Sequence, residues 1–397
     1  MKAIVNGKLV FPDRITYGVV LVDKDRIIAS GEEVCIPEGA EIIDADGLYV
    51  GPGLFDQHVH GYKQYGEAFD VTDNARATAL CHLKHGTTQI TPSAAYNLSK
   101  EDFISVIDQC NAAIKKGDTS IVGIHFEGPF TNPLNGANSQ LTWEFSEELC
   151  SEIFERAGKN VLHCTYAPEM PHGKRMEEVL KKYKVIPDIG HTRADPESIY
   201  RGVENGAKIV THLFDAMGNY KGADETVFSF TGDPQECVSD IVLSIPGLYY
   251  ELICDSRSLH VRPVSIRQTY RAASEDYIIC ISDATGSEGK LNPEDYPPED
   301  PKSAKDLNFN EKGELSGSRL VAAQSVANFM ANTGADVRVG FKAGSTNSAK
   351  ALNLYDDYGS IDAGKFANII FVDERFSVKQ VMFKGEMLDE VRPELRV

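Results

Sequence analysis

The chain has 397 residues, of which 42% are hydrophobic and 25% charged, and its formal net charge at pH 7 is −19. This length is enough for one large domain of about 250–300 residues with a smaller companion. The acidic balance disfavours nucleic acid and anionic membranes as partners, since both require clustered Lys and Arg. It does not exclude a small anionic substrate, because a local basic pocket can outweigh distant charges.

The sequence also indicates the cellular compartment. No apolar run approaches the ~20 residues of a membrane span, and residues 1–5 do not start the longer apolar core of a signal peptide. The eight cysteines are scattered without a C-x-x-C pair, so we expect reduced, mostly buried thiols. We therefore expect a cytoplasmic protein.

Both ends of the chain have the pattern of short β-strands. Residues 3–5, 18–22 and 26–29 are β-like, and Asn6-Gly7 predicts a turn after the first of them. Residues 367–372 and 378–383 have the same character and precede a turn at Lys384-Gly385. We expect residues 1–50 and 356–397 to combine into one small β-sandwich domain.

Residues 51–355 alternate between apolar β-like runs and helix-like stretches, which is typical of a parallel α/β architecture. Eight candidate strands end near His58, Thr91, Glu127, Tyr166, Gly190, Thr211, Asp255 and Asp283. Eight such strands predict a (β/α)8 TIM-like barrel. The stretch 286–312 is rich in Pro, Glu, Asp and Lys and reads as a long excursion after the eighth strand.

The first barrel strand carries two alternating histidines, His58 and His60. We expect the apolar run 48–55 to form the buried strand that delivers them. Alternate residues of a strand point to the same face, so both imidazoles can bind one divalent metal. An H-x-H pattern alone is weak evidence, because ten histidines can produce it by chance.

Four further ligand-type residues follow other predicted strands, where the catalytic face of such a barrel lies. Taken singly, either of the two histidines among them could be structural, the glutamate could be a surface or an ion-paired carboxylate, and the aspartate could cap a helix. Their joint placement at several strand ends instead predicts a two-metal shell of imidazoles and carboxylates. These residues are Glu127, His191, His212 and Asp283.

At these residues the chain resembles the amidohydrolase superfamily, and within it the deacetylases of amino sugar phosphates. The resemblance covers nearly the whole chain. It rests on Pro52-Gly53-Leu54-Phe55-Asp56, His125-Phe126-Glu127-Gly128-Pro129, Ala167-Pro168-Glu169, Gly190-His191-Thr192, Thr211-His212-Leu213-Phe214-Asp215-Ala216-Met217, Ser282-Asp283-Ala284, Leu315-Ser316-Gly317-Ser318 and the segment 359–368.

The resemblance implies a metal-dependent hydrolysis. Glu127, His191 and His212 would hold one divalent metal, and His58 and His60, with Glu127 bridging, a second. Zinc and iron are the first candidates, because imidazole ligation suits them. Asp283, placed in the metal shell, would take a proton from the attacking water and deliver it to the departing amine. The reaction would release acetate from an N-acetylated amino sugar, with N-acetylglucosamine 6-phosphate as the first candidate, and the enzyme would be a homodimer.

The positions that would contact the substrate depart from the family pattern. Asp215, next to Ala216, stands where the family usually has Asn, and Asn138 where it has His. Arg257-Ser258-Leu259-His260 keeps only the histidine of the family's Asp-Gly-x-His. The expected phosphate-binding Arg is replaced by Ala223, which leaves Lys221 as the nearby cation or as a solvated loop residue.

Two other functions therefore stay open at this stage. The altered pocket could select a different amide, such as an N-acyl amino acid or a cyclic amide. The barrel could also be a non-catalytic binding protein, although such a protein has no need of the predicted metal shell.

Overall fold

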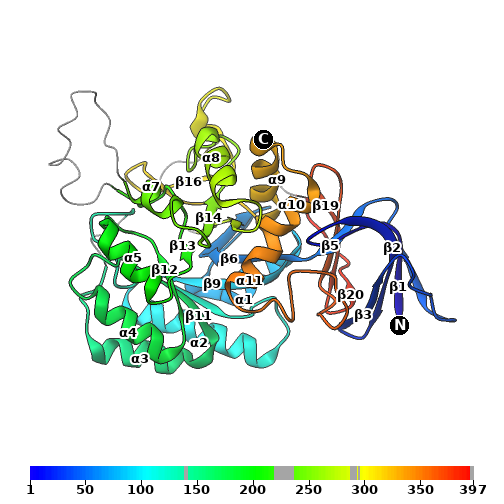
Figure 1. Ribbon diagram of the computed structural model, residues 1–397, viewed down its shortest axis with the longest axis horizontal. Coiled ribbons are helices and arrows are strands. Elements are labelled where there is room, and N and C mark those ends of the chain that lie inside the picture. Colours follow the sequence, from blue (N-terminus) through cyan, green and yellow to red (C-terminus); the bar gives the residue numbers. More distant parts are fainter. Residues whose placement is uncertain (138–141, 219–236, 287–292, 294–295, 394–397) are drawn as a thin grey trace.

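The computed structural model describes residues 1–137, 142–218, 237–286, 293 and 296–393. Eight parallel strands form one sheet in the order β15-β14-β13-β12-β11-β10-β9-β6, and helices cover its outer face (Figure 1). The strands are β6 Leu54–Val59, β9 Thr87–Ala95, β10 Ile124–Glu127, β11 Val161–Tyr166, β12 Ile186–Ile189, β13 Ile209–Val210, β14 Tyr249–Ile253 and β15 Ile278–Ile281. The expected (β/α)8 barrel is therefore confirmed.

The first and last strands are joined at their carboxyl ends by backbone hydrogen bonds. The Asp283 amide donates to the His58 carbonyl over 3.0 Å, and the His60 amide donates to the Ala284 carbonyl over 2.7 Å. These bonds nearly close the barrel. They also hold the histidine pair of β6 beside the aspartate that follows β15.

The helices follow the strands in the expected alternation. They are α1 Val71–Leu83, α2 Lys100–Lys116, α3 Glu147–Ala157, α4 Gly173–Tyr183, α5 Pro196–Glu204, α7 Val238–Leu243, α8 Pro263–Ala273, α9 Ala322–Thr333, α10 Val337–Phe341 and α11 Asn347–Ala351, with a π-helical turn at Lys342–Thr346 and 3₁₀ turns at Gly158–Asn160 and Pro301–Ser303. Within the described residues, none of them is both long and apolar enough to cross a membrane.

Alternation along β10 shows how the barrel separates its core from its site. Phe126 points outward and packs against Phe103 of α2 and Phe154 of α3, with ring centroids 4.9 and 5.3 Å away. Its neighbours His125 and Glu127 therefore point to the barrel interior, since successive side chains of a strand face opposite ways. Burying Phe126 on one face thus fixes the direction of Glu127 on the other.

Strands from both chain ends form a second sheet beside the barrel, where the blue and red strands of Figure 1 lie together. Its order is β20-β19-β18-β5-β1-β2-β3, with β4 pairing β1. The strands are β1 Lys2–Val10, β2 Ile15–Asp23, β3 Arg26–Gly31, β4 Glu41–Asp44, β5 Tyr49–Pro52, β18 Ile369–Val372, β19 Val378–Phe383 and β20 Glu386–Met387. Both chain ends contribute to it, as expected, whereas the domain limits at residues 50 and 356 stay a prediction.

Two local predictions at the amino end are wrong. Asn6-Gly7 does not end a strand: β1 continues through it, and the pairing with β2 shifts register there while Asn6 adopts φ 57°. Such a bulge uses the same left-handed residues as a turn. The run 48–55 is likewise two strands, with β5 in the small sheet and β6 in the barrel. Gly53 lies between them so close to Thr88 that a Cβ atom would approach its hydroxyl to 1.9 Å.

Two hairpins complete the described structure. One, β7 Gly61–Gln64 with β8 Glu67–Asp70, follows the histidine strand. The other, β16 Leu307–Phe309 with β17 Leu315–Ser318, belongs to the excursion after β15. Ser318 pairs with Ala284, so the excursion returns to the carboxyl end of the barrel. All eight cysteines are free and six are buried, as expected.

An ion-pair cluster joins the barrel to the small sheet. Glu275, between α8 and β15, accepts hydrogen bonds from Arg338 of α10 over 2.7 and 2.8 Å and from Lys342 over 2.8 Å. Arg338 also donates to the Pro12 carbonyl, which follows β1. The Arg338 hydrogen bond, aided by Lys342, lowers the pKa of Glu275 to about 2.

We predict that Glu275→Gln destabilises the protein by about 1 kcal/mol at pH 7, since the pair is only partly exposed and bidentate. A lowered pKa contributes stability above the ordinary carboxyl pKa, and that contribution is lost as the pH falls toward about 2. Urea unfolding at several pH values should show a difference from wild type that shrinks below pH ~4.5. The matched control Asp13→Asn, in the exposed Arg14 pair, should change stability by less than about 0.5 kcal/mol. A difference that does not depend on pH would contradict the assignment.

Candidate metal centre

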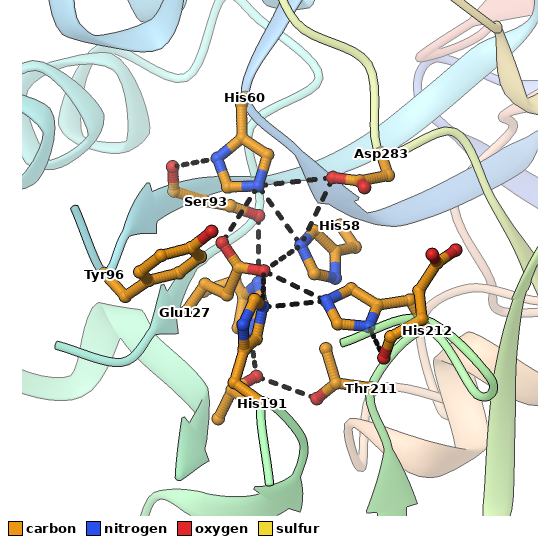
Figure 2. Close-up of polar contacts among 12 residues, drawn as sticks. His58, His60, Ser93, Tyr96, Glu127, His191, Thr211, His212 and Asp283 are labelled. Atoms are coloured by element: carbon orange, nitrogen blue, oxygen red, sulfur yellow. Dashed lines mark hydrogen bonds and ion pairs between the residues drawn. The ribbon is translucent and has the colours of Figure 1, made fainter. Parts of the chain in front are cut away.

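The carboxyl end of the barrel brings together all six residues that the sequence analysis predicted as metal ligands (Figure 2). Glu127 lies at the centre. Its Oε1 is 2.8 Å from His191 Nε2, 3.1 Å from His212 Nε2 and 3.4 Å from His58 Nε2, and its Oε2 is 3.3 Å from His60 Nε2. One carboxylate therefore contacts all four imidazoles.

Asp283, which follows the neighbouring strand β15, completes the group. Its Oδ1 lies 3.4 Å from His60 Nε2 and 3.6 Å from His58 Nε2. It faces the histidine pair and lines the adjacent cavity, which is not the position of a helix-capping side chain. His58, His60 and Asp283 form one cluster with metal-ligand spacing, and His58, Glu127 and His212 form another.

The four imidazoles share one orientation. The Nδ1–H groups of His60, His191 and His212 donate to the backbone carbonyls of Ser93, Asn135 and Asp215 over 3.1, 3.0 and 3.2 Å, and His58 Nδ1 lies 3.1 Å from Glu251 Oε2. A carbonyl only accepts, so each of those three rings carries a proton on Nδ1. Every Nε2 is thereby directed to the centre.

This orientation makes the donor set fit a bound cation. His58 and His60 approach each other Nε2 to Nε2 at 3.2 Å, and His191 and His212 at 3.0 Å. In the neutral tautomers these atoms carry facing lone pairs, which repel unless a proton or metal ion lies between them. Two inward pairs of imidazoles sharing one carboxylate match the ligand chemistry of zinc or iron.

The ionised carboxylates of the group also favour a bound cation. Burial lowers the pKa of His60, but Glu127 and Asp283 outweigh it and raise that pKa to about 9. Burial likewise raises the pKa of Glu127, yet the neighbouring His191 and His60 hold it well below the ordinary value. The carboxylates therefore stay ionised and attract positive charge to the centre.

Backbone strain marks the same residues. His191, His212 and Asp283 have φ angles of 46°, 27° and 47°, in the left-handed region that non-glycine residues rarely occupy. Such conformations cost on the order of 1–3 kcal/mol each and persist where the surrounding structure enforces them. Each lies two residues beyond the end of its strand, at the carboxyl end of the barrel.

A second layer of buried imidazoles supports the centre from below. His125 bonds to Ser93 Oγ at 2.9 Å and Thr165 Oγ1 at 3.0 Å, and its ring stacks on His163, which pairs with Asp188. Ser93 Oγ also accepts the Val59 amide, and its carbonyl accepts His60. The ring nitrogens of His125 and His163 are already hydrogen-bonded, so we assign this layer a structural role. Through Ser93 it fixes the position of β6.

A cavity of about 350 Å³ opens beside the metal centre. Asp215, Ala216 and His260, three of the predicted substrate-binding residues, line it. Asn138 and Lys221, the other two, lie outside the described residues. Gly317, from the motif Leu315-Ser316-Gly317-Ser318, also lines the cavity, as does Tyr96, which was not predicted from the sequence.

The His260 ring is held by the carboxylate of Asp255. Its Nδ1 lies 3.0 Å from Asp255 Oδ2. Burial lowers the pKa of His260, but Asp255 and Asp215 raise it to about 9, so the ring carries a positive charge at pH 7. Its Nε2 lies 3.2 Å from the Gly317 carbonyl oxygen, so both ring nitrogens have partners within the protein.

The sequence analysis missed Glu251 in the middle of β14. It is fully buried and contacts the outer nitrogen of His58. The available signal was an acidic residue inside the otherwise apolar run Tyr249-Tyr250-Glu251-Leu252-Ile253, since an ionised side chain is rarely buried without a partner.

Comparison with known proteins agrees with this architecture. The model of the amidohydrolase family matches residues 264–388. N-acetylglucosamine-6-phosphate deacetylase of Lysinibacillus sphaericus is 26% identical over 382 residues, covering 92% of each chain. The fold matches the crystal structure of N-acetylglucosamine-6-phosphate deacetylase from Pasteurella multocida with a TM-score of 0.81 at 23% identity, over 98% of this chain and 99% of that one. It also matches a Mycobacterium smegmatis deacetylase mutant in complex with N-acetyl-D-glucosamine-6-phosphate, with a TM-score of 0.79 at 20% identity, over 97% and 98%.

We predict that Glu127→Gln weakens the binding of divalent metal by more than about 100-fold, beyond the loss typical of residues outside the ligand shell. The amide is neutral and offers a single oxygen ligand, so it cannot provide the negative charge and the two oxygens that two metal ions would share. Metal titration of chelator-treated protein measures the loss. The matched control is Glu177→Gln, a buried carboxylate of α4 paired with Arg201, which should keep wild-type metal affinity. Equal affinities in wild type and Glu127→Gln would contradict the placement of Glu127.

Proposed function

We propose that this chain, which belongs to the amidohydrolase superfamily, hydrolyses the acetamide of an N-acetylated amino sugar, with N-acetylglucosamine 6-phosphate as the first candidate. The observation that carries the proposal is the convergence of four imidazoles, Glu127 and Asp283 at the mouth of the barrel, beside a cavity. End-to-end similarity to amino sugar deacetylases supports the choice of substrate class.

Two divalent ions, zinc or iron, would occupy the centre, one held by Glu127, His191 and His212 and one by His58 and His60 with Glu127 shared. When bound, they would lower the pKa of water toward about 7 and polarise the carbonyl of the acetamide. The inward orientation of all four Nε2 atoms supports this assignment.

Asp283 is the proposed proton carrier. Burial raises its pKa, but the hydrogen bond from His60 and the nearby His58 outweigh it and lower the pKa below the ordinary value, so the carboxylate is ionised and can accept a proton. In the reaction it takes a proton from the attacking water and delivers it to the nitrogen of the breaking C–N bond. The products are acetate and the free amine.

His260, Asp215 and Ala216 are the proposed contacts to the sugar, together with Asn138 and Lys221. The positive charge of His260 suits a hydroxyl or phosphate oxygen, whereas Asp215 suits a hydroxyl that donates a hydrogen bond. We further propose that the enzyme acts on its small-molecule substrate in the cytoplasm as a homodimer, without nucleic acid or membrane as partner.

Acetate release tests the proposal directly. Purified, metal-loaded protein should convert N-acetylglucosamine 6-phosphate to acetate and glucosamine 6-phosphate, and a chelator should abolish the reaction. Parallel incubations with unphosphorylated N-acetylglucosamine and with N-acyl amino acids show which of these substrates the protein hydrolyses. The absence of acetate and free amine from both amino sugars would overturn the proposal.

We predict that Asp283→Asn lowers kcat by about 10²–10⁴-fold, the usual contribution of a positioned acid–base group. The amide keeps the size of the side chain but cannot accept the proton. Steady-state kinetics on the preferred amino sugar measure kcat, and metal analysis of the same samples separates proton transfer from metal loss. A variant with kcat within about threefold of wild type would rule out this role.

A further inference from the structure

We infer that Glu251 is a positioning residue that sets the affinity of one of the two metal sites, the one built on His58 and His60. The inference rests on the proposed metal-dependent function. Glu251 lies in the middle of β14 and is fully buried, and its Oε2 is 3.1 Å from His58 Nδ1, on the side of the ring opposite the metal centre.

Glu251 gives His58 a partner unlike that of the other imidazoles. The Nδ1–H groups of His60, His191 and His212 donate to neutral backbone carbonyls. His58 alone among the four donates to a carboxylate. An anionic acceptor fixes the Nδ1–H tautomer and increases the electron density on the opposite nitrogen, which strengthens that nitrogen as a metal ligand.

The contacts of Glu251 show that it acts as a carboxylate. Its Oε1 accepts the Gln57 Nε2–H over 2.7 Å, and its Oε2 also accepts the His212 backbone N–H over 3.2 Å. With the His58 Nδ1–H, three donors converge on the two oxygens of this carboxylate, and a neutral amide would turn its own N–H donors toward one of them.

The same contacts connect two parts of the metal centre. Gln57 and His58 belong to β6, and His212 follows β13, so Glu251 ties the histidine pair to the strained turn that holds the other site. The bond to His212 is made through its backbone, whereas the bond to His58 is made through the ligand ring itself. Loss of the carboxylate charge should therefore weaken metal binding mainly at the His58–His60 site.

Glu251→Gln tests the inference by metal titration rather than by activity. Wild type and variant are freed of metal and titrated with Zn²⁺ in a calorimeter. We expect one of the two sites to weaken by about 10–100-fold, the usual loss when a carboxylate behind a ligand histidine is removed, while the other stays within about threefold. Titration with Co²⁺ should show a shifted visible absorption for the weakened site only.

Asp255→Asn is the matched control. Asp255 follows the same strand and makes the same carboxylate–imidazole contact, to His260, over 3.0 Å, but His260 is not among the predicted metal ligands. It should leave both zinc affinities at wild-type values. If Glu251→Gln leaves both sites unchanged, or weakens both equally, the inference is overturned and Glu251 has a purely structural role.

A second measurement does not depend on a folded variant. In the ¹H–¹⁵N spectrum of the zinc-loaded wild-type protein, His58 should carry its proton on Nδ1, shifted further downfield than the Nδ1 protons of His60, His191 and His212. A His58 proton that resembles the other three would overturn the inference. Neither measurement reads activity, so both can succeed even if the amino sugar assay fails.

Discussion

The structure of the site depends on one electrostatic constraint: four buried imidazoles direct their inner nitrogens at one carboxylate. Because the outer nitrogens of His60, His191 and His212 donate to backbone carbonyls, their inner nitrogens cannot also carry a proton in the neutral state. Inner nitrogens only 3.0–3.2 Å apart repel each other unless positive charge lies between them. A protein with no cation to bind would gain nothing from this arrangement.

The rest of the barrel serves to hold that arrangement. The left-handed backbone at His191, His212 and Asp283 is stable only because the strands beneath are fixed by their own packing. The layer of His125 and His163 fixes β6 through Ser93. The backbone bonds between β6 and β15 place Asp283 opposite the histidine pair. Hydrogen bonds in the barrel interior thus maintain the strained backbone at its mouth, as is common where strain is stored at functional sites.

The fold, and the meeting of six ligand-type residues at one end of the barrel, could be predicted because both depend on a regular pattern. Parallel strands end at one edge, so ligand-type residues after several predicted strands had to meet there. Local geometry was less predictable: Asn6-Gly7 has the residues of a turn but forms a bulge inside β1. Glu251 was not predicted because its role depends on which side chains meet inside the closed barrel: β14 is not adjacent to β6 in the sheet, and Glu251 is 193 residues from His58 in sequence. The substrate contacts are harder still, since they depend on loops such as the one that carries Asp215.

Anomalous X-ray scattering from crystals of the zinc-loaded protein tests whether the donor set holds two metal ions with Glu127 between them. Data collected on both sides of the zinc absorption edge should give two peaks, one among His58, His60 and Glu127 and one among Glu127, His191 and His212. A single peak would contradict the two-metal account. No peak at this end of the barrel would contradict the metal centre altogether.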